Sequence, residues 1–307
     1  MNRSPWRFRN LVGGFVLCGG LVAATAGGCG LESAYYHPSS RAFDTPAGVE
    51  DLQLIATDGV GLHAWFIPAP DVASGAAARA PVIIICPGSR TQIDELEPLV
   101  RPRGAKAGAS LVLLSYRGYG RSDPVQRVTR AGTVCDALAA LDAVLRRADV
   151  NADKVAMLGY SIGGIPALAV AAERAEVRCA VIGGTYATAR LALEDHEQSW
   201  AHLLIGDDHD PQASAERLGP RPLMVFHGRL DGVIPPYHAL LIAAAAMRQG
   251  TPVSLRIADN AGHRTILEDD PALLDAIAAF LKRSWALPRA LGEPPTLRPS
   301  DLSPAAP

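Results

Sequence analysis

The chain has 307 residues, of which 49% are hydrophobic and 20% are charged, and its formal net charge at pH 7 is -2. Its length allows one large domain or two small ones, with a sizeable buried core. A chain with so little net charge lacks the basic surplus needed to neutralise phosphates, so no nucleic-acid partner is expected. The eight histidines and five cysteines are too scattered to predict a metal site or a disulfide framework, and we expect no cofactor.

Residues 1–28 have the pattern of an export signal. Arg3, Arg7 and Arg9 precede an uncharged, largely apolar stretch over 11–28 that ends in small residues. Six glycines and the short length argue against a stable membrane-spanning helix, although an uncleaved anchor is the alternative. We therefore predict an exported protein of the periplasm or cell envelope.

Two processing sites compete at the end of this leader. Ala24-Thr25-Ala26 fits ordinary signal-peptidase cleavage before Gly27. Residues 26–29 instead resemble a bacterial lipobox, in which Cys29 is lipidated and becomes the mature N-terminus, although Leu is more usual where this chain has Ala. Lipidation would attach the protein to a membrane.

From residue 45 to residue 285 the chain alternates between predicted strands and helices. Asp58-Gly59 predicts the turn of an antiparallel hairpin. Apolar runs without polar alternation follow, as parallel strands covered on both faces require. These runs are 82–86, 111–116, 155–160, 179–182, 223–227 and, more weakly, 253–257. Helical patterns lie between the later runs and after the last one, notably around Leu138–Leu145, after Pro235-Pro236 and after Asp270-Pro271. The pattern predicts one α/β domain, a mainly parallel sheet with helices on both faces.

Two segments fall outside this alternation. Residues 187–218 separate two predicted strands by more than a usual connection, and we expect a small cap there. Residues 286–307 contain six prolines and no core pattern, which predicts a disordered tail.

Ser161 is the predicted nucleophile. Residues 159–163 read Gly-Tyr-Ser-Ile-Gly, a G-x-S-x-G pattern between an apolar predicted strand and a small-residue predicted helix. A nucleophile elbow has this strand–turn–helix placement, and its glycines allow close approach of backbone to the serine. The alternative is a Ser-Gly turn without chemistry.

Asp231 and His263 are the predicted partners of Ser161. A serine hydroxyl needs a base to remove its proton, and the base needs a carboxylate to orient it. Asp231 follows the predicted strand 223–227 and His263 follows 253–257, so both lie where the carboxyl ends of strands meet. The rival acids are Asp207, Asp208 and Asp210 in the cap segment. Of the other histidines, His227 is expected to bond locally, and His196, His202 and His209 to form a solvated group rather than a metal site.

The oxyanion hole requires two backbone N–H donors. One is assigned to Ile162, directly after the nucleophile. The other is assigned to Ser89, in the loop after the predicted strand 82–86.

With these residues placed, the chain resembles the α/β-hydrolase superfamily over about 35–283, and within it an exported or membrane-associated serine esterase/thioesterase-like branch. The shared motifs are Gly-Tyr-Ser-Ile-Gly-Gly from Gly159, Tyr-Arg-Gly-Tyr-Gly-Arg-Ser from Tyr116, H-G-x-x-D-x-x-x-P from His227, and Tyr36-His37-Pro38 followed by Asp58-Gly59. The resemblance implies the α/β-hydrolase fold and hydrolysis, and it leaves the substrate open. This chain departs at Pro87-Gly88-Ser89, where the branch usually has His-Gly-Asn.

We therefore expect hydrolysis of a small-molecule acyl ester or thioester through an acyl-enzyme on Ser161. The alternatives are a peptidase or amidase on the same scaffold, whose relatives often carry a large extra N-terminal domain, and an inactive lipoprotein used for binding. Substrates with acyl chains of short to medium length are expected to be preferred, because the cap segment offers one small apolar cluster around Trp200.

Overall fold

The computed structural model describes residues 35–196, 206 and 208–288, and the described residues form one eight-stranded sheet in the order β1-β2-β4-β3-β5-β6-β7-β8. The strands are β1 (Glu50–Ile55), β2 (Gly61–Ile67), β3 (Ala80–Cys86), β4 (Ser110–Ser115), β5 (Val150–Tyr160), β6 (Val177–Gly183), β7 (Leu223–Gly228) and β8 (Val253–Ala258). The β1–β2 hairpin joins β4 in antiparallel fashion, and all other neighbours are parallel. The predicted mainly parallel sheet is confirmed.

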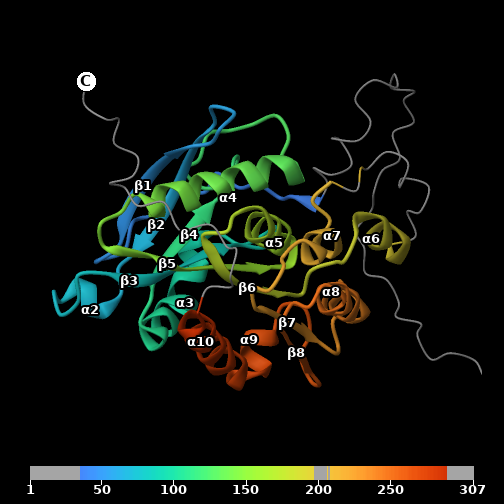
Figure 1. Ribbon diagram of the computed structural model, residues 1–307. Coiled ribbons are helices and arrows are strands. Elements are labelled where there is room, and N and C mark those ends of the chain that lie inside the picture. Colours follow the sequence, from blue (N-terminus) through green and yellow to red (C-terminus); the bar gives the residue numbers. More distant parts are fainter. Residues whose placement is uncertain (1–34, 197–205, 207, 289–307) are drawn as a thin grey trace, which may run out of the picture.

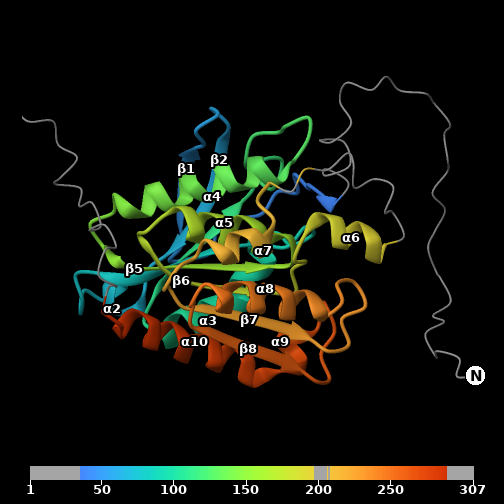
Figure 2. The same cartoon turned by 45° about the vertical axis from the view of Figure 1, so that its right-hand side comes forward.

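Helices cover both faces of the sheet (Figures 1 and 2). They are α2 (Pro70–Ala73), α3 (Ile93–Ala107), α4 (Arg130–Leu145), α5 (Gly164–Glu173), α6 (Ala189–Asp195), α7 (Pro211–Glu216), α8 (Tyr237–Arg248), α9 (Ile266–Asp269) and α10 (Pro271–Ala286). On one face α4, α5, α7 and α8 pack side by side, and on the other α3 packs against α10.

The apolar core forms two layers because successive residues of a strand point to opposite faces. In β3, Val82 and Ile84 belong to the layer beneath α4 and α5, whereas Ile83 and Ile85 belong to the layer beneath α3 and α10. Both faces are covered, which explains why the central strands lack polar alternation.

The cysteines at 86 and 179 behave as small buried hydrophobes. Both are free and fully buried, and burial raises the pKa of each thiol to about 12. Neither therefore supplies a reactive thiolate at neutral pH.

Several predicted features lie outside the described residues: the leader with Cys29, most of the Pro-rich tail, and the apolar cluster around Trp200. Of the segment 187–218, the structure describes α6, α7 and their flanks. Among the helices that are described, none combines the length and the apolar character needed to cross a membrane.

Candidate active site

Ser161 lies at the sharp turn between β5 and α5. Its φ is +56°, in the left-handed region that residues other than glycine rarely adopt, and a short 3₁₀ turn (η2, Ser161–Gly163) leads into the helix. Such backbone strain persists only where the surrounding structure holds it.

Two glycines make this turn possible. A Cβ added to Gly159 would lie 2.1 Å from the carbonyl oxygen of Gly163. A Cβ added to Gly163 would lie 2.0 Å from the carbonyl oxygen of Cys86, at the end of β3. Real Cβ atoms cannot approach backbone so closely, so both positions of the motif require glycine.

The structure brings Ser161, His263 and Asp231 together from three loops at the carboxyl edge of the sheet. His263 Nε2 lies 3.1 Å from Ser161 Oγ, and His263 Nδ1 lies 2.7 Å from Asp231 Oδ2. A carboxylate only accepts hydrogen bonds, so Nδ1 carries the proton and Nε2 can accept the serine proton. This is the geometry that general-base activation of a serine requires.

Asp231 is held as a carboxylate by several donors. Its Oδ1 accepts the N–H groups of Val233 and Ile234 at 2.9 and 2.8 Å. Burial by itself would raise the pKa of Asp231, but hydrogen bonds from His227, His263 and the Ile234 N–H outweigh it and hold that pKa well below its usual range. Asp231 therefore remains an anion that can stabilise a protonated His263.

His227 is a second histidine on this acid, a contact that sequence reasoning missed. Its Nε2 lies 2.8 Å from the carbonyl oxygen of Ile234, which is the local hydrogen bond that the sequence predicted. The same Nε2 also lies 3.1 Å from Asp231 Oδ2. Its side chain is 1% exposed. The signal in the sequence is the four-residue spacing from His227 to Asp231 inside the H-G-x-x-D motif.

Tyr160 supports the histidine loop. Its ring stacks on Phe226 with centroids 5.9 Å apart, and its hydroxyl donates to the carbonyl oxygen of His263. Burial raises the pKa of Tyr160 above its ordinary value, so the hydroxyl keeps the proton that it donates.

The predicted oxyanion loop, 87–89, is anchored by the tyrosines of the 116–122 motif. Tyr116 donates to the carbonyl oxygen of Pro87 at 3.3 Å, and Tyr119 donates to that of Ser89 at 2.8 Å. A Cβ on Gly88 would lie 3.4 Å from Ser161 Cβ, so the loop runs next to Ser161. Within the described part of the chain, the Ser89 N–H donates to no other group. The loop thus offers a backbone donor close to Ser161.

Of the rival acids that the structure describes, Asp208 and Asp210, neither pairs with His263, which pairs with Asp231. Asp210 is buried in an ion pair with Arg130 at 2.8 Å and also accepts the N–H of Ala189 at 2.9 Å. Asp208 is exposed, and Asp207 and His202 lie outside the described residues. His196 lines the cavity at the site, and His209 lies 4.0 Å from Glu173. No cluster that could hold a metal ion occurs among the residues the structure describes.

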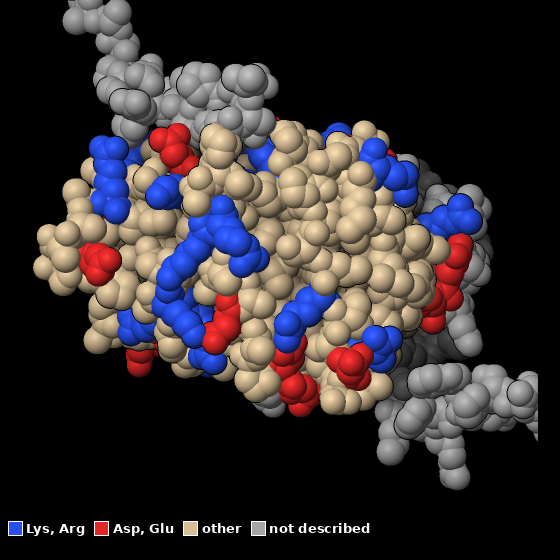
Figure 3. All heavy atoms as spheres, turned by 60° about the horizontal axis from the view of Figure 1, so that its bottom comes forward, with Lys and Arg blue, Asp and Glu red and all other residues tan. Residues whose placement is uncertain are grey.

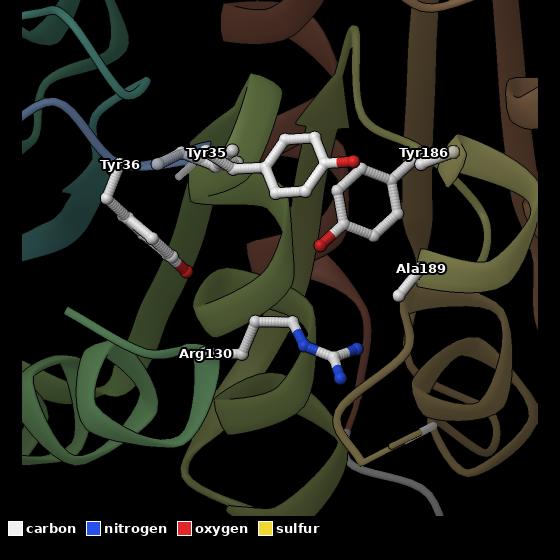
Figure 4. Close-up of a pocket in the computed structure, with 7 residues that line it drawn as sticks. Tyr35, Tyr36, Arg130, Tyr186 and Ala189 are labelled. Carbon is white, nitrogen blue, oxygen red and sulfur yellow. The ribbon is translucent and has the colours of Figure 1, made fainter. Parts of the chain in front are cut away.

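Ser161 and His263 open into a cavity of about 660 Å³, a size typical of small-molecule sites. Beside it lies a second space of about 10 Å³, where the side chains of Tyr35, Tyr186 and Arg130 turn toward one another (Figure 4). The second space holds at most one water molecule. A substrate therefore has to lie in the larger cavity.

Comparisons with known proteins agree with this architecture. Residues 105–287, more than half of the chain, match the prolyl oligopeptidase family. The uncharacterized protein YfhR of Salmonella typhi is 29% identical over 216 residues, which cover 66% of this chain and 72% of YfhR.

Two solved structures share the fold. The esterase Pf2001 of Pyrococcus furiosus superposes with a TM-score of 0.64 at 16% identity, covering 80% of this chain and 96% of the esterase. A puromycin-hydrolyzing peptidase of Mycobacterium tuberculosis superposes with a TM-score of 0.64 at 21% identity, covering 78% of this chain and 40% of the peptidase. Identities this low show the α/β-hydrolase fold alone.

Proposed function

The chain belongs to the prolyl oligopeptidase family of the α/β-hydrolase superfamily, and we propose that it is a serine hydrolase that cleaves carboxylic ester or thioester bonds. The observation that carries this proposal is the continuous hydrogen-bonded chain from Ser161 Oγ through His263 to Asp231, open to a cavity of substrate size.

In the proposed reaction, Ser161 Oγ attacks the acyl carbonyl while His263 Nε2 takes its proton. The N–H groups of Ile162 and Ser89 stabilise the negative charge that develops on the carbonyl oxygen. The protonated His263 then gives its proton to the leaving alcohol or thiol, which leaves an acyl-enzyme. A water molecule, activated by the same histidine, releases the acid and restores Ser161.

The cavity favours esters and thioesters with apolar groups. Its described lining is largely hydrophobic, and the arginines in it, Arg90 and Arg264, are exposed. Among these described lining residues there is no carboxylate to receive the amino terminus of a peptide. A peptidase or amidase is the second candidate, supported by the family match.

Hydrolysis of p-nitrophenyl esters, a thioester and amino-acid p-nitroanilides by the purified protein separates the two candidates. We expect turnover of the esters and the thioester that Ser161→Ala abolishes. If the protein hydrolyses the anilides but not the esters, it is a peptidase or amidase, and the esterase proposal is wrong.

We further propose that the protein is exported and that Cys29 carries a lipid that holds it on a membrane. Small residues running into a cysteine at the end of an apolar leader support this. Mass spectrometry of the mature protein from a bacterial host is expected to show a lipidated N-terminal Cys29. A mature chain that begins at Gly27 with an unmodified cysteine would contradict lipidation.

A further inference from the structure

One end of the active-site cavity extends between the sheet and the first turns of α3 and α10. Its walls include Leu96 and Val100 from α3 and Leu274 and Ile277 from α10, and its floor includes Ile85 and Leu158 from the sheet. We call this end the α3–α10 arm. It lies in the layer of the core opposite α4 and α5.

The arm is an apolar space left open in an otherwise packed layer. Leu96, Val100, Leu158 and Leu274 are only partly buried, although each packs against the core. Protein interiors are normally filled to the density of organic crystals, and unfilled apolar space is destabilising. An apolar occupant that fills the arm would remove this loss.

The geometry also sets the depth of the arm. Helices α3 and α10 begin near the edge of the sheet that carries Ser161, and Val100 and Ile277 lie seven and six residues into them. At 1.5 Å per residue, the arm reaches about 10 Å below that edge. With carbon–carbon bonds of about 1.5 Å in a zigzag, such a depth holds on the order of six to eight carbon atoms.

We propose that the α3–α10 arm binds the linear hydrocarbon chain of the substrate and sets its preferred length at roughly six to eight carbons. The inference rests on the proposed function, because the arm is continuous with Ser161 and His263. It assigns the selection of chain length to α3 and α10 instead of the cap segment.

The test uses substitutions that narrow the arm, one on α10 and one on α3. In Ile277→Phe and Val100→Phe, the larger ring occupies the deep end of the arm. Ala279→Phe is the matched control, because it adds the same ring on an exposed position of α10. Thermal unfolding of each variant checks that it is folded. Two series of esters are compared: p-nitrophenyl esters graded in the length of the acyl chain, and alkyl esters graded in the length of the alcohol. In each series, the kcat/KM for the eight-carbon chain is divided by the kcat/KM for the two-carbon chain.

In the unchanged protein, kcat/KM is expected to rise with chain length up to about eight carbons in one of the two series, which identifies the side of the ester that enters. Both narrowing variants are expected to lower the eight-to-two ratio at least about tenfold, and Ala279→Phe to leave it unchanged. If Ile277→Phe and Val100→Phe both fold and both keep the eight-to-two ratio of the unchanged protein, the inference is overturned. Failure of Ser161 to react with a fluorophosphonate would instead overturn the proposed function.

Discussion

At the scale of single residues, the site depends on close contacts that a few side chains and glycines make possible. His227 illustrates this because it contacts Asp231, the proposed acid, and a backbone oxygen of the same loop. It is buried and is not among the described residues that line the cavity, so we regard it as a positioning residue for Asp231.

His227→Asn is expected to lower kcat by about 10- to 100-fold with little change in KM, because Asp231 loses a donor and orients His263 less well. The lost buried hydrogen bonds should also cost about 1–3 kcal/mol of stability. His209→Asn, which changes a histidine remote from the triad, is the control. Equal kcat for His227→Asn and the parent would show that the contact is only structural.

The glycines of the elbow give a second prediction. Gly163→Ala should prevent the turn at Ser161 and yield an unfolded or inactive protein, because its Cβ would overlap the carbonyl of Cys86. Gly232→Ala, beside the acid, meets nothing within 4 Å and is expected to fold and react normally. Circular dichroism and ester turnover compare the two, and a fully active Gly163→Ala would disprove the packing argument.

Sequence reasoning at this scale could predict Ser161, Asp231 and His263, which the structure brings within hydrogen-bond distance of one another, because their order and their positions after apolar strands are local features. It did not identify Tyr160 or Tyr119 as supports for the site. Their roles depend on which backbone carbonyls the folded loops bring within reach, 103 residues away for Tyr160 and 30 for Tyr119.

At the scale of elements, the strands were predictable because two-sided burial leaves a continuous apolar run. Helix α3 was not among the predicted helices. Pro98 and Pro102 lie inside it, and proline in a helix interior costs about 3 kcal/mol. Tertiary packing compensates, since α3 approaches β4 so closely that a Cβ on Gly104 would lie 2.7 Å from Leu111. The α3–α10 arm could not be predicted from the sequence either, because it depends on the packing of α3, which is likewise a tertiary feature.

The link between α8 and α6 predicts a dependence of stability on pH. His238 is fully buried, its Nδ1 accepts the N–H of Ala187 at 3.0 Å, and its Nε2 lies 2.7 Å from Asp195. Burial lowers the pKa of His238, and the Asp195 carboxylate opposes this only in part. The folded protein therefore takes up this proton at lower pH than the unfolded chain, whose histidines titrate near 6.5.

As pH falls below about 6.5, the unfolded chain binds the proton first, so the free energy of unfolding decreases until the folded pKa is reached. The decrease for this histidine is at most about 1.4 kcal/mol per pH unit. Urea unfolding at pH 7.5 and 5.0 is expected to show a smaller loss for His238→Gln than for the parent. An identical loss in both proteins would exclude His238 as a source.

At the scale of the whole molecule, the surface on the side of α3 and α10 is only sparsely charged (Figure 3). Figure 3 shows charged side chains of both signs separated by broad uncharged areas on the side of α3 and α10. There the exposed pair Lys106–Asp275 joins the two helices at 2.6 Å, although exposed pairs contribute about 1 kcal/mol or less.

The sequence predicted the fold class from the alternation of strands and helices, whereas the position of β4 between β2 and β3 depends on crossovers that only the structure shows.

The central claim is that Ser161 is the nucleophile of a working serine hydrolase. Intact-protein mass spectrometry after treatment with a fluorophosphonate tests it directly. We expect the mass of one adduct on the parent protein, mapped to Ser161, and no adduct on Ser161→Ala. Asp231→Asn should react far more slowly, because His263 is left in the wrong tautomer to accept the serine proton. Labelling of Ser161→Ala to the same extent as the parent would contradict the assignment.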